Sequence, residues 1–150
     1  ATTVSNCTAG LHLSCLAAGF GPGDEVIVPA QTHTATAHAV EFTGAKAVFG
    51  DVDPLSGNIF LEELERKLTD QTKGVIPVHM SGYPCNMDEI KTFCNRNNLI
   101  LIEDCAHAVG TTFNDTHVGN LCLSFSTFPL EGCLLLSMMF CNEFCRFVIG

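Results

Sequence analysis

The stretch Gly21–Pro29, which reads GPGDEVIVP, decides the fold class of this chain. A turn rich in glycine and proline leads into Val26–Val28, and the final proline stops this wholly apolar run, which is typical of a short buried strand. Thr34–Phe42 then predicts a helix closed by a nearby glycine, and Ala47–Phe49 predicts a second apolar strand. A strand, a helix and another strand in this order form a βαβ unit, which favours a parallel sheet.

The same alternation continues on both sides of this unit. Ser5 and Asn6 cap a predicted helix that Gly19 ends. On the other side, helices and strands alternate again at Ile59–Leu68, Val75–Val78, Met87–Asn97 and Leu99–Ile102. Near the end we expect a strand pair in Cys122–Phe128 and Cys133–Ser137, and a last helix from about Asn142. We therefore predict one α/β domain in three layers, with a mainly parallel sheet and helices on both faces.

Composition excludes several classes of protein. With 47% hydrophobic and 15% charged residues, the chain does not have the composition of a disordered protein. A net charge of −9 without a cluster of lysine and arginine argues against nucleic-acid binding. No signal peptide opens the chain, and the longest apolar run, Cys133–Cys141, is too short to span a bilayer. We therefore expect no nucleic-acid or membrane partner.

Nine cysteines are many for 150 residues. They form no Cys-x-x-Cys pair and no spacing typical of zinc, and several lie inside apolar stretches. Reduced core thiols are therefore the favoured interpretation, with a disulfide framework or a metal site as alternatives. Reduced thiols indicate a reducing compartment, most simply the cytoplasm.

In a parallel sheet, ligands bind beyond the carboxyl ends of the strands. The polar residues at those ends are Asp51, Asp53, His79, Glu103 and Asp104. The first predicted helix begins at Ser5, Asn6 and Thr8, and its free N–H groups suit a phosphate. Each residue also has an ordinary interpretation, as a helix cap, a turn former or a core histidine bonded to backbone. The spacing alone predicts an α/β domain with a candidate anion site.

Several motifs, in order, make the prediction more specific. They are Ser5–Leu11, Gly21–Pro29, Thr32–Ala37, Gly44–Phe49, Val78–Gly82, Met87–Ile90 and Ile102–Gly110. Together they resemble the DegT/DnrJ/EryC1/StrS family of sugar aminotransferases, which depend on pyridoxal 5′-phosphate (PLP) and have the aspartate-aminotransferase fold. The resemblance extends from about residue 4 to about residue 132. It implies that residues 1–150 are an incomplete PLP-binding large domain, without the family's N-terminal segment and C-terminal small domain.

The resemblance implies cofactor-binding roles for six residues: Thr8, Ala9, His33, Asp104, His107 and Ser126. Thr8 and Ala9 match the helix start that binds the PLP phosphate, and Ser126 matches a serine that also contacts it. The ring of His33 matches a side chain that stacks on the pyridine. Asp104 matches the carboxylate that pairs with the pyridinium nitrogen, and His107 lies near the ring hydroxyl.

One departure from the family concerns catalysis. The family's aldimine lysine, which binds PLP covalently, is expected between Pro129 and Glu131, where this chain has only Leu130. The lysines at 46, 67, 73 and 91 lie in earlier segments, and His117 is a poor substitute because we expect it in a turn. We therefore assign no catalytic residue and expect the chain as written to be inactive.

The implied activity is transfer of an amino group from an amino acid, most simply glutamate, to a nucleotide-linked keto-sugar. Such products serve the synthesis of polysaccharide, lipopolysaccharide or antibiotic sugars. The alternatives are a PLP-dependent sugar dehydratase of the same family and a catalytically dead truncated product. The full-length relatives are expected to be cytoplasmic homodimers in which the partner chain completes each site.

Overall fold

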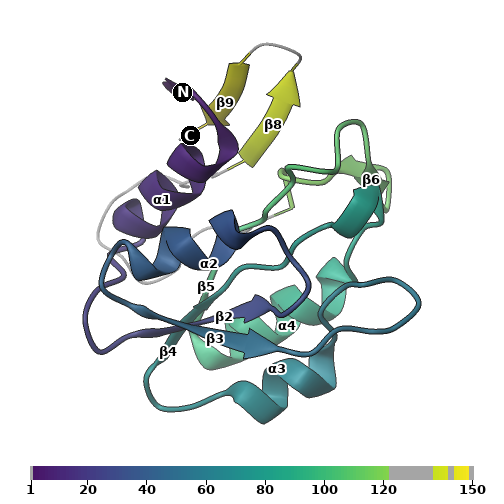
Figure 1. The fold of residues 1–150 in the computed structure, drawn as a ribbon. Coiled ribbons are helices and arrows are strands. Elements are labelled where there is room, and N and C mark those ends of the chain that lie inside the picture. Colours follow the sequence, from purple (N-terminus) through teal and green to yellow (C-terminus); the bar gives the residue numbers. More distant parts are fainter. Residues whose placement is uncertain (1, 122–136, 142–143, 149–150) are drawn as a thin grey trace.

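Four parallel strands form the central sheet of the computed structural model, which describes residues 2–121, 137–141 and 144–148 (Figure 1). Their order is β3–β2–β4–β5, and their bounds are β2 (Glu25–Pro29), β3 (Lys46–Gly50), β4 (Thr72–Val75) and β5 (Ile100–Leu101). Because all four run in the same direction, their carboxyl ends lie at one edge of the sheet.

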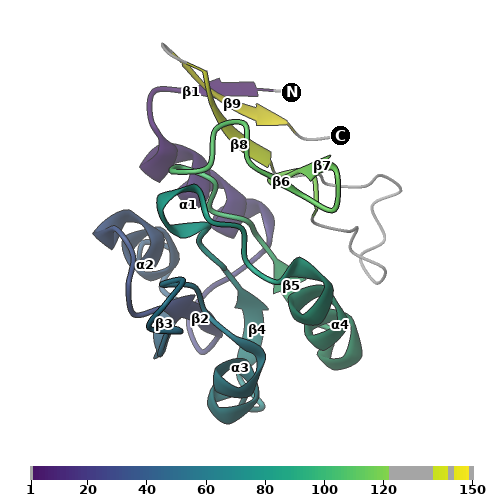
Figure 2. The same cartoon turned by 90° about the vertical axis from the view of Figure 1, so that its right-hand side faces the viewer.

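Helices cover both faces of this sheet (Figure 2). Val26 and Val28 pack under α1 (Cys7–Ala17) and α2 (Thr34–Glu41), while Ile27 packs against α3 (Leu61–Lys67) and α4 (Met87–Asn97). Successive side chains of a strand point to opposite faces, so three consecutive apolar residues supply both cores. The predicted three-layer α/β architecture is confirmed.

Two smaller sheets lie outside the central one. β1 (Thr2–Val4), β9 (Phe144–Val148) and β8 (Ser137–Cys141) form an antiparallel sheet beside α1. β6 (Thr112–Phe113) and β7 (Thr116–His117) form a hairpin after β5. A single 3₁₀ turn, η1 (Met80–Gly82), follows the extended segment that continues β4.

Three predictions near the strands need correction. The predicted last helix near Asn142 is wrong, because Phe144–Val148 is β9, paired with β1 and β8. The strand expected at Val75–Val78 occupies Thr72–Val75 instead, since Pro77 has no N–H group to donate to a ladder. His117 lies in β7 rather than in a turn. The strand pair expected in residues 122–137 lies outside the described residues, except for Ser137 at the start of β8.

Burial of thiols agrees with the favoured interpretation of the cysteines. Cys15, Cys85, Cys94 and Cys105 are buried and free, and burial raises the pKa of the Cys15 and Cys94 thiols to about 12. These side chains act as small apolar groups in the two cores. Within the described part of the chain, no helix is both long and apolar enough to cross a membrane.

Candidate functional site

Asp104 lies at the carboxyl end of β5, and its backbone is fixed to the neighbouring segment. Its N–H donates to the carbonyl of Pro77 at 3.0 Å. Its carboxylate is 3% exposed and accepts hydrogen bonds from the Thr36 hydroxyl (2.8 Å) and the Ala106 N–H (3.1 Å). The thiol of Cys7 also donates to it, with Sγ 3.8 Å from Oδ1. A buried carboxylate supplied with such donors is held in one orientation.

Two helix starts meet at this carboxylate. Cys7 is the first residue of α1, and Thr36 lies in the first turn of α2. The structure therefore brings the N-terminus of α1, the N-terminus of α2 and the end of β5 to one place. A helix start favours negative charge, whereas a buried carboxylate favours a positively charged partner. The site can thus bind a molecule with an anionic end and a protonated nitrogen.

The start of α1 has the geometry of an anion site. Asn6 is its N-cap, and Asn6 Oδ1 accepts the Ala9 N–H at 2.9 Å. Helix geometry leaves the N–H of Thr8, at the second helical position, without an acceptor inside α1. An anion would meet the N–H of Thr8 directly, while at Ala9 it competes with the Asn6 cap.

His33 and His107 are both exposed: His33 lies three residues before Thr36, which bonds to Asp104, and His107 lies three residues after Asp104. His33 is the N-cap of α2, where its Nδ1 accepts the Ala35 N–H at 3.2 Å, one helical turn before Thr36. This bond orients the imidazole at the N-terminus of α2. His107 follows Ala106 in the turn after Asp104. Ser126 and the Pro129–Glu131 segment lie outside the described residues.

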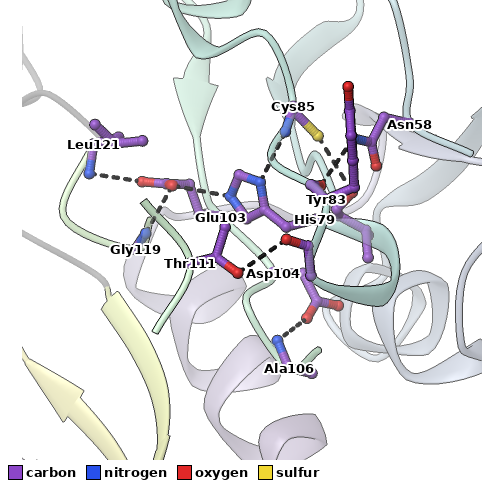
Figure 3. Close-up of polar contacts among 12 residues, drawn as sticks. Asn58, His79, Tyr83, Cys85, Glu103, Asp104, Ala106, Thr111, Gly119 and Leu121 are labelled. Atoms are coloured by element: carbon purple, nitrogen blue, oxygen red, sulfur yellow. Dashed lines mark hydrogen bonds and ion pairs between the residues drawn. The ribbon is translucent and has the colours of Figure 1, made fainter. Parts of the chain in front are cut away.

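Next to Asp104 lies a buried pair, His79 and Glu103 (Figure 3). Both side chains are fully buried, and His79 Nε2 lies 3.1 Å from Glu103 Oε2. His79 Nδ1 accepts the Cys85 N–H at 3.1 Å. Glu103 also accepts the N–H groups of Gly119 (2.8 Å) and Leu121 (3.0 Å). The alternative that His79 is a core histidine bonded to backbone is confirmed.

The buried pair is a hydrogen-bond network rather than a metal site. The ligand-type atoms of His79, Glu103 and Cys105 lie within 4.8 Å of one another. However, both ring nitrogens and both carboxylate oxygens already have hydrogen-bond partners. Burial, followed by the charge of Glu103, raises the pKa of the Cys105 thiol.

Asp51 and Asp53 do not join this site. Asp53 Oδ1 accepts the N–H groups of Leu55 and Ser56 in a turn, and the hydrogen bonds from Ser56 lower the pKa of Asp53. The N–H of Asp51 donates to Glu63 on α3. The interpretation of Asp53 as a turn former is therefore confirmed, whereas Asp51 lies before that turn and is bonded to α3. A groove of about 700 Å³ adjoins this turn, and its lining contains none of the predicted cofactor residues.

Two contacts of Asp104 were not predicted from the sequence, those from Cys7 and Thr36. A weak signal existed for Thr36, because Thr32 and Thr36 are four positions apart at a predicted helix start. Their hydroxyls are 2.7 Å apart and continue the hydrogen bonding that reaches Asp104. The thiol of Cys7 gave no signal, because its contact depends on how α1 packs over the sheet.

The model of the DegT/DnrJ/EryC1/StrS aminotransferase family matches residues 1–131. The chain is similar to GDP-perosamine synthase of Escherichia coli O157:H7, with 42% identity over 132 residues, 88% of this chain and 36% of that protein. GDP-perosamine synthase of Caulobacter vibrioides is 45% identical over 130 residues, 85% of this chain and 35% of that protein. The chain thus spans about a third of the length of these relatives.

Solved structures also show similarity to enzymes of this kind. An aminotransferase from Psychrobacter cryohalolentis superimposes with a TM-score of 0.79 and 42% identity, covering 80% of this chain and 30% of that one. A GDP-4-keto-6-deoxymannose-3-dehydratase, solved with a trapped PLP–glutamate geminal diamine, gives a TM-score of 0.75 and 33% identity, over 81% of this chain and 33% of that one.

Proposed function

The chain belongs to the DegT/DnrJ/EryC1/StrS aminotransferase family, and we propose that its 150 residues are the cofactor-holding part of a PLP-dependent sugar aminotransferase. The observation that carries the proposal is the contact between Cys7 and Asp104, which joins the start of α1 to a buried carboxylate. PLP has a phosphate at one end and a ring nitrogen at the other, so it needs both features close together.

The donor set at Asp104 fits such a ring nitrogen. A carboxylate has about four lone-pair positions, and the Thr36 hydroxyl, the Ala106 N–H and the Cys7 thiol account for three in the described residues. One position is left for a further donor. When bound, PLP supplies an electron sink for amino transfer, and a carboxylate paired with its nitrogen strengthens that property.

The other predicted residues would act on the remaining parts of the cofactor. Thr8 and Ala9 would donate N–H groups to the phosphate, supported by the dipole of α1, and Ser126 would add a hydroxyl. His33, oriented by its bond to Ala35, would lie against the face of the pyridine. His107 would lie near the ring hydroxyl.

For the substrate we infer a nucleotide-linked keto-sugar, with an amino acid such as glutamate as the donor. The names of the two relatives at 42% and 45% identity support a GDP-linked sugar. One observation favours a second function: the structurally similar dehydratase acts on GDP-4-keto-6-deoxymannose. By family resemblance, the two activities differ at the position where this chain lacks a lysine, so we infer that the chain as written completes neither reaction alone.

Mass spectrometry separates these three alternatives. The chain would be incubated with PLP, ¹⁵N-glutamate and GDP-4-keto-6-deoxymannose. We expect no product. An aminated sugar containing ¹⁵N would establish the aminotransferase, and a sugar that has lost a hydroxyl group would establish the dehydratase. The free thiols support a cytoplasmic location. The family supports a homodimer for the complete protein.

Cofactor binding itself is tested with pyridoxamine 5′-phosphate (PMP), which has no aldehyde and so does not react with lysine side chains. Equilibrium dialysis should show that Asp104→Asn weakens binding about tenfold or more, because a hydrogen bond to a charged group is lost. Asp70→Asn is the matched control, since Asp70 is exposed in the turn before β4. Equal affinity of the two variants, or no binding by the wild-type chain, would refute the proposal.

A further inference from the structure

The buried pair, His79 and Glu103, lies next to Asp104, whose carboxylate the proposed function assigns to the cofactor (Figure 3). We propose that this pair positions Asp104 for cofactor binding and fixes residues 119–121 beside it, an inference that rests on the proposed function. Glu103 precedes Asp104, and the two side chains have different partners. Asp104 meets the starts of α1 and α2, while Glu103 meets His79 and the segment after the β6–β7 hairpin.

Glu103 holds that segment through backbone groups. Oε2 accepts the N–H of Gly119 at 2.8 Å, and Oε1 accepts the N–H of Leu121 at 3.0 Å. An ionised carboxylate accepts at both oxygens, and hydrogen bonds to a charged acceptor are about twice as strong as neutral ones. Because Glu103 is fully buried, water cannot replace these bonds. The position of residues 119–121 therefore depends on this carboxylate.

His79 fixes the carboxylate from the other side. Its Nδ1 accepts the N–H of Cys85, so the ring proton lies on Nε2 and is donated to Glu103 Oε2. The backbone of His79 is also tied to the site, because its N–H donates to the carbonyl of Asp104 at 3.2 Å. The histidine thus contacts both members of the Glu103–Asp104 dipeptide.

The consequence is that Glu103 links two described parts of the chain, the turn that carries Asp104 and residues 119–121. Asp104 is the proposed partner of the ring nitrogen and is the next residue along the chain. A shift of Glu103 would move the Asp104 carboxylate and residues 119–121 together. Glu103 and His79 are positioning residues, because they act through Asp104 and residues 119–121.

The test compares two buried glutamates. In Glu103→Gln, the new NH₂ group opposes one of the three N–H donors. Glu63→Gln is the matched control, since Glu63 is buried on α3, accepts the Asp51 N–H at 2.8 Å and contacts Arg66. Amide hydrogen exchange by NMR and PMP affinity by dialysis are measured at a temperature where all variants are folded.

In Glu103→Gln we expect the amides of Ala106, Gly119 and Leu121 to exchange about tenfold faster or more, and PMP affinity to fall about tenfold, through loss of bonds to a buried charge. In Glu63→Gln these three amides and the PMP affinity should match the wild type. Unchanged exchange of Ala106 in Glu103→Gln, or an equal loss of PMP affinity in both variants, would overturn the inference.

A second pair of variants covers the case in which Glu103→Gln does not fold. His79→Gln keeps an N–H donor for Glu103, whereas His79→Leu does not. Exchange of Ala106 should rise more in His79→Leu than in His79→Gln, and equal rates in the two would contradict the inference. If the wild-type chain does not bind PMP, the proposed function alone fails, because exchange at Ala106 still decides the positioning.

Discussion

The hydroxyl of Thr36 donates a 2.8 Å hydrogen bond to Oδ2 of Asp104, although 68 positions separate the two residues in the sequence. Thr36 is fully buried, and its hydroxyl also lies 2.7 Å from that of Thr32. The bond connects the start of α2, where His33 is the N-cap, to the segment that follows β5. The relative position of these two elements is therefore set by a polar contact as well as by the apolar core.

Replacing Thr36 with valine should weaken both the fold and the site. Valine has nearly the same shape but no hydroxyl, so Asp104 loses a buried donor and we expect unfolding free energy to fall by about 1–3 kcal/mol. Chemical denaturation measures this loss. Thr92→Val is the control, because the Thr92 hydroxyl bonds to the carbonyl of Asp88 on the exposed side of α4. A loss no larger than that of the control would contradict the role of Thr36.

Asn6→Ala should lower the stability of the chain and increase the stabilisation that PMP, through its phosphate, gives on binding. Loss of the cap on α1 costs about 1 kcal/mol, because Asn6 Oδ1 accepts the Ala9 N–H. The freed N–H is then available to an anion, so PMP should raise the melting temperature of Asn6→Ala more than that of the wild type. Thermal unfolding with and without PMP measures the two shifts. A smaller shift in the variant would show that Ala9 does not bind the phosphate.

Cys7 should react with iodoacetamide faster than Cys15, Cys85, Cys94 and Cys105, which are buried. It is half-buried at the start of α1, whereas burial raises the pKa of Cys15 and Cys94 to about 12. Labelling at pH 8, followed by peptide mass spectrometry, resolves each site. Because Cys7 contacts Asp104, bound PMP should slow its labelling. If PMP leaves the rate at Cys7 unchanged, the cofactor does not bind beside this carboxylate.

Acid should destabilise the chain partly through Glu63. Hydrogen bonds from Arg66 lower the pKa of Glu63 from 4.5 to about 2. Since the pKa is lower in the folded state, the carboxylate stabilises the fold above about pH 4.5, and this contribution is lost as the pH falls towards 2. Urea denaturation between pH 6 and pH 2 should give a shallower decline for Glu63→Gln than for the wild type. Glu62→Gln, exposed on the same helix, should keep the wild-type slope.

Much of the fold was predictable because its signals are local. Val26–Val28 is apolar on both faces, which identifies a central parallel strand, and the cap at Asn6 identified the start of α1. The β6–β7 hairpin was missed although Asn114 and Asp115, both at positive φ, are residues that favour such a turn. β9 was mistaken for a helix because its partners include Val4, near the other end of the sequence.

For the site, the order of strands and helices predicts which residues lie at one edge of the sheet, but not which side chains contact one another. The edge of a parallel sheet collects the strand ends, so Asp104 and the start of α1 were expected near each other. The contacts of Thr36 and Cys7 depend on how α1 and α2 cross the sheet, which no local pattern encodes. The backbone partners of Glu103 come from residues 119–121, a segment outside helices and strands and therefore without periodicity.

The contact between Cys7 and Asp104 also limits when this site can assemble during translation. The ribosome releases α1 well before β5, so the nascent helix emerges without the carboxylate that it later touches. Until Ile100 appears, β4 has only β2 beside it, and its other side remains an open edge that a chaperone or a neighbouring chain can pair with. Ribosomes that pause between α4 and β5 would prolong the stage at which this edge of β4 is unpaired.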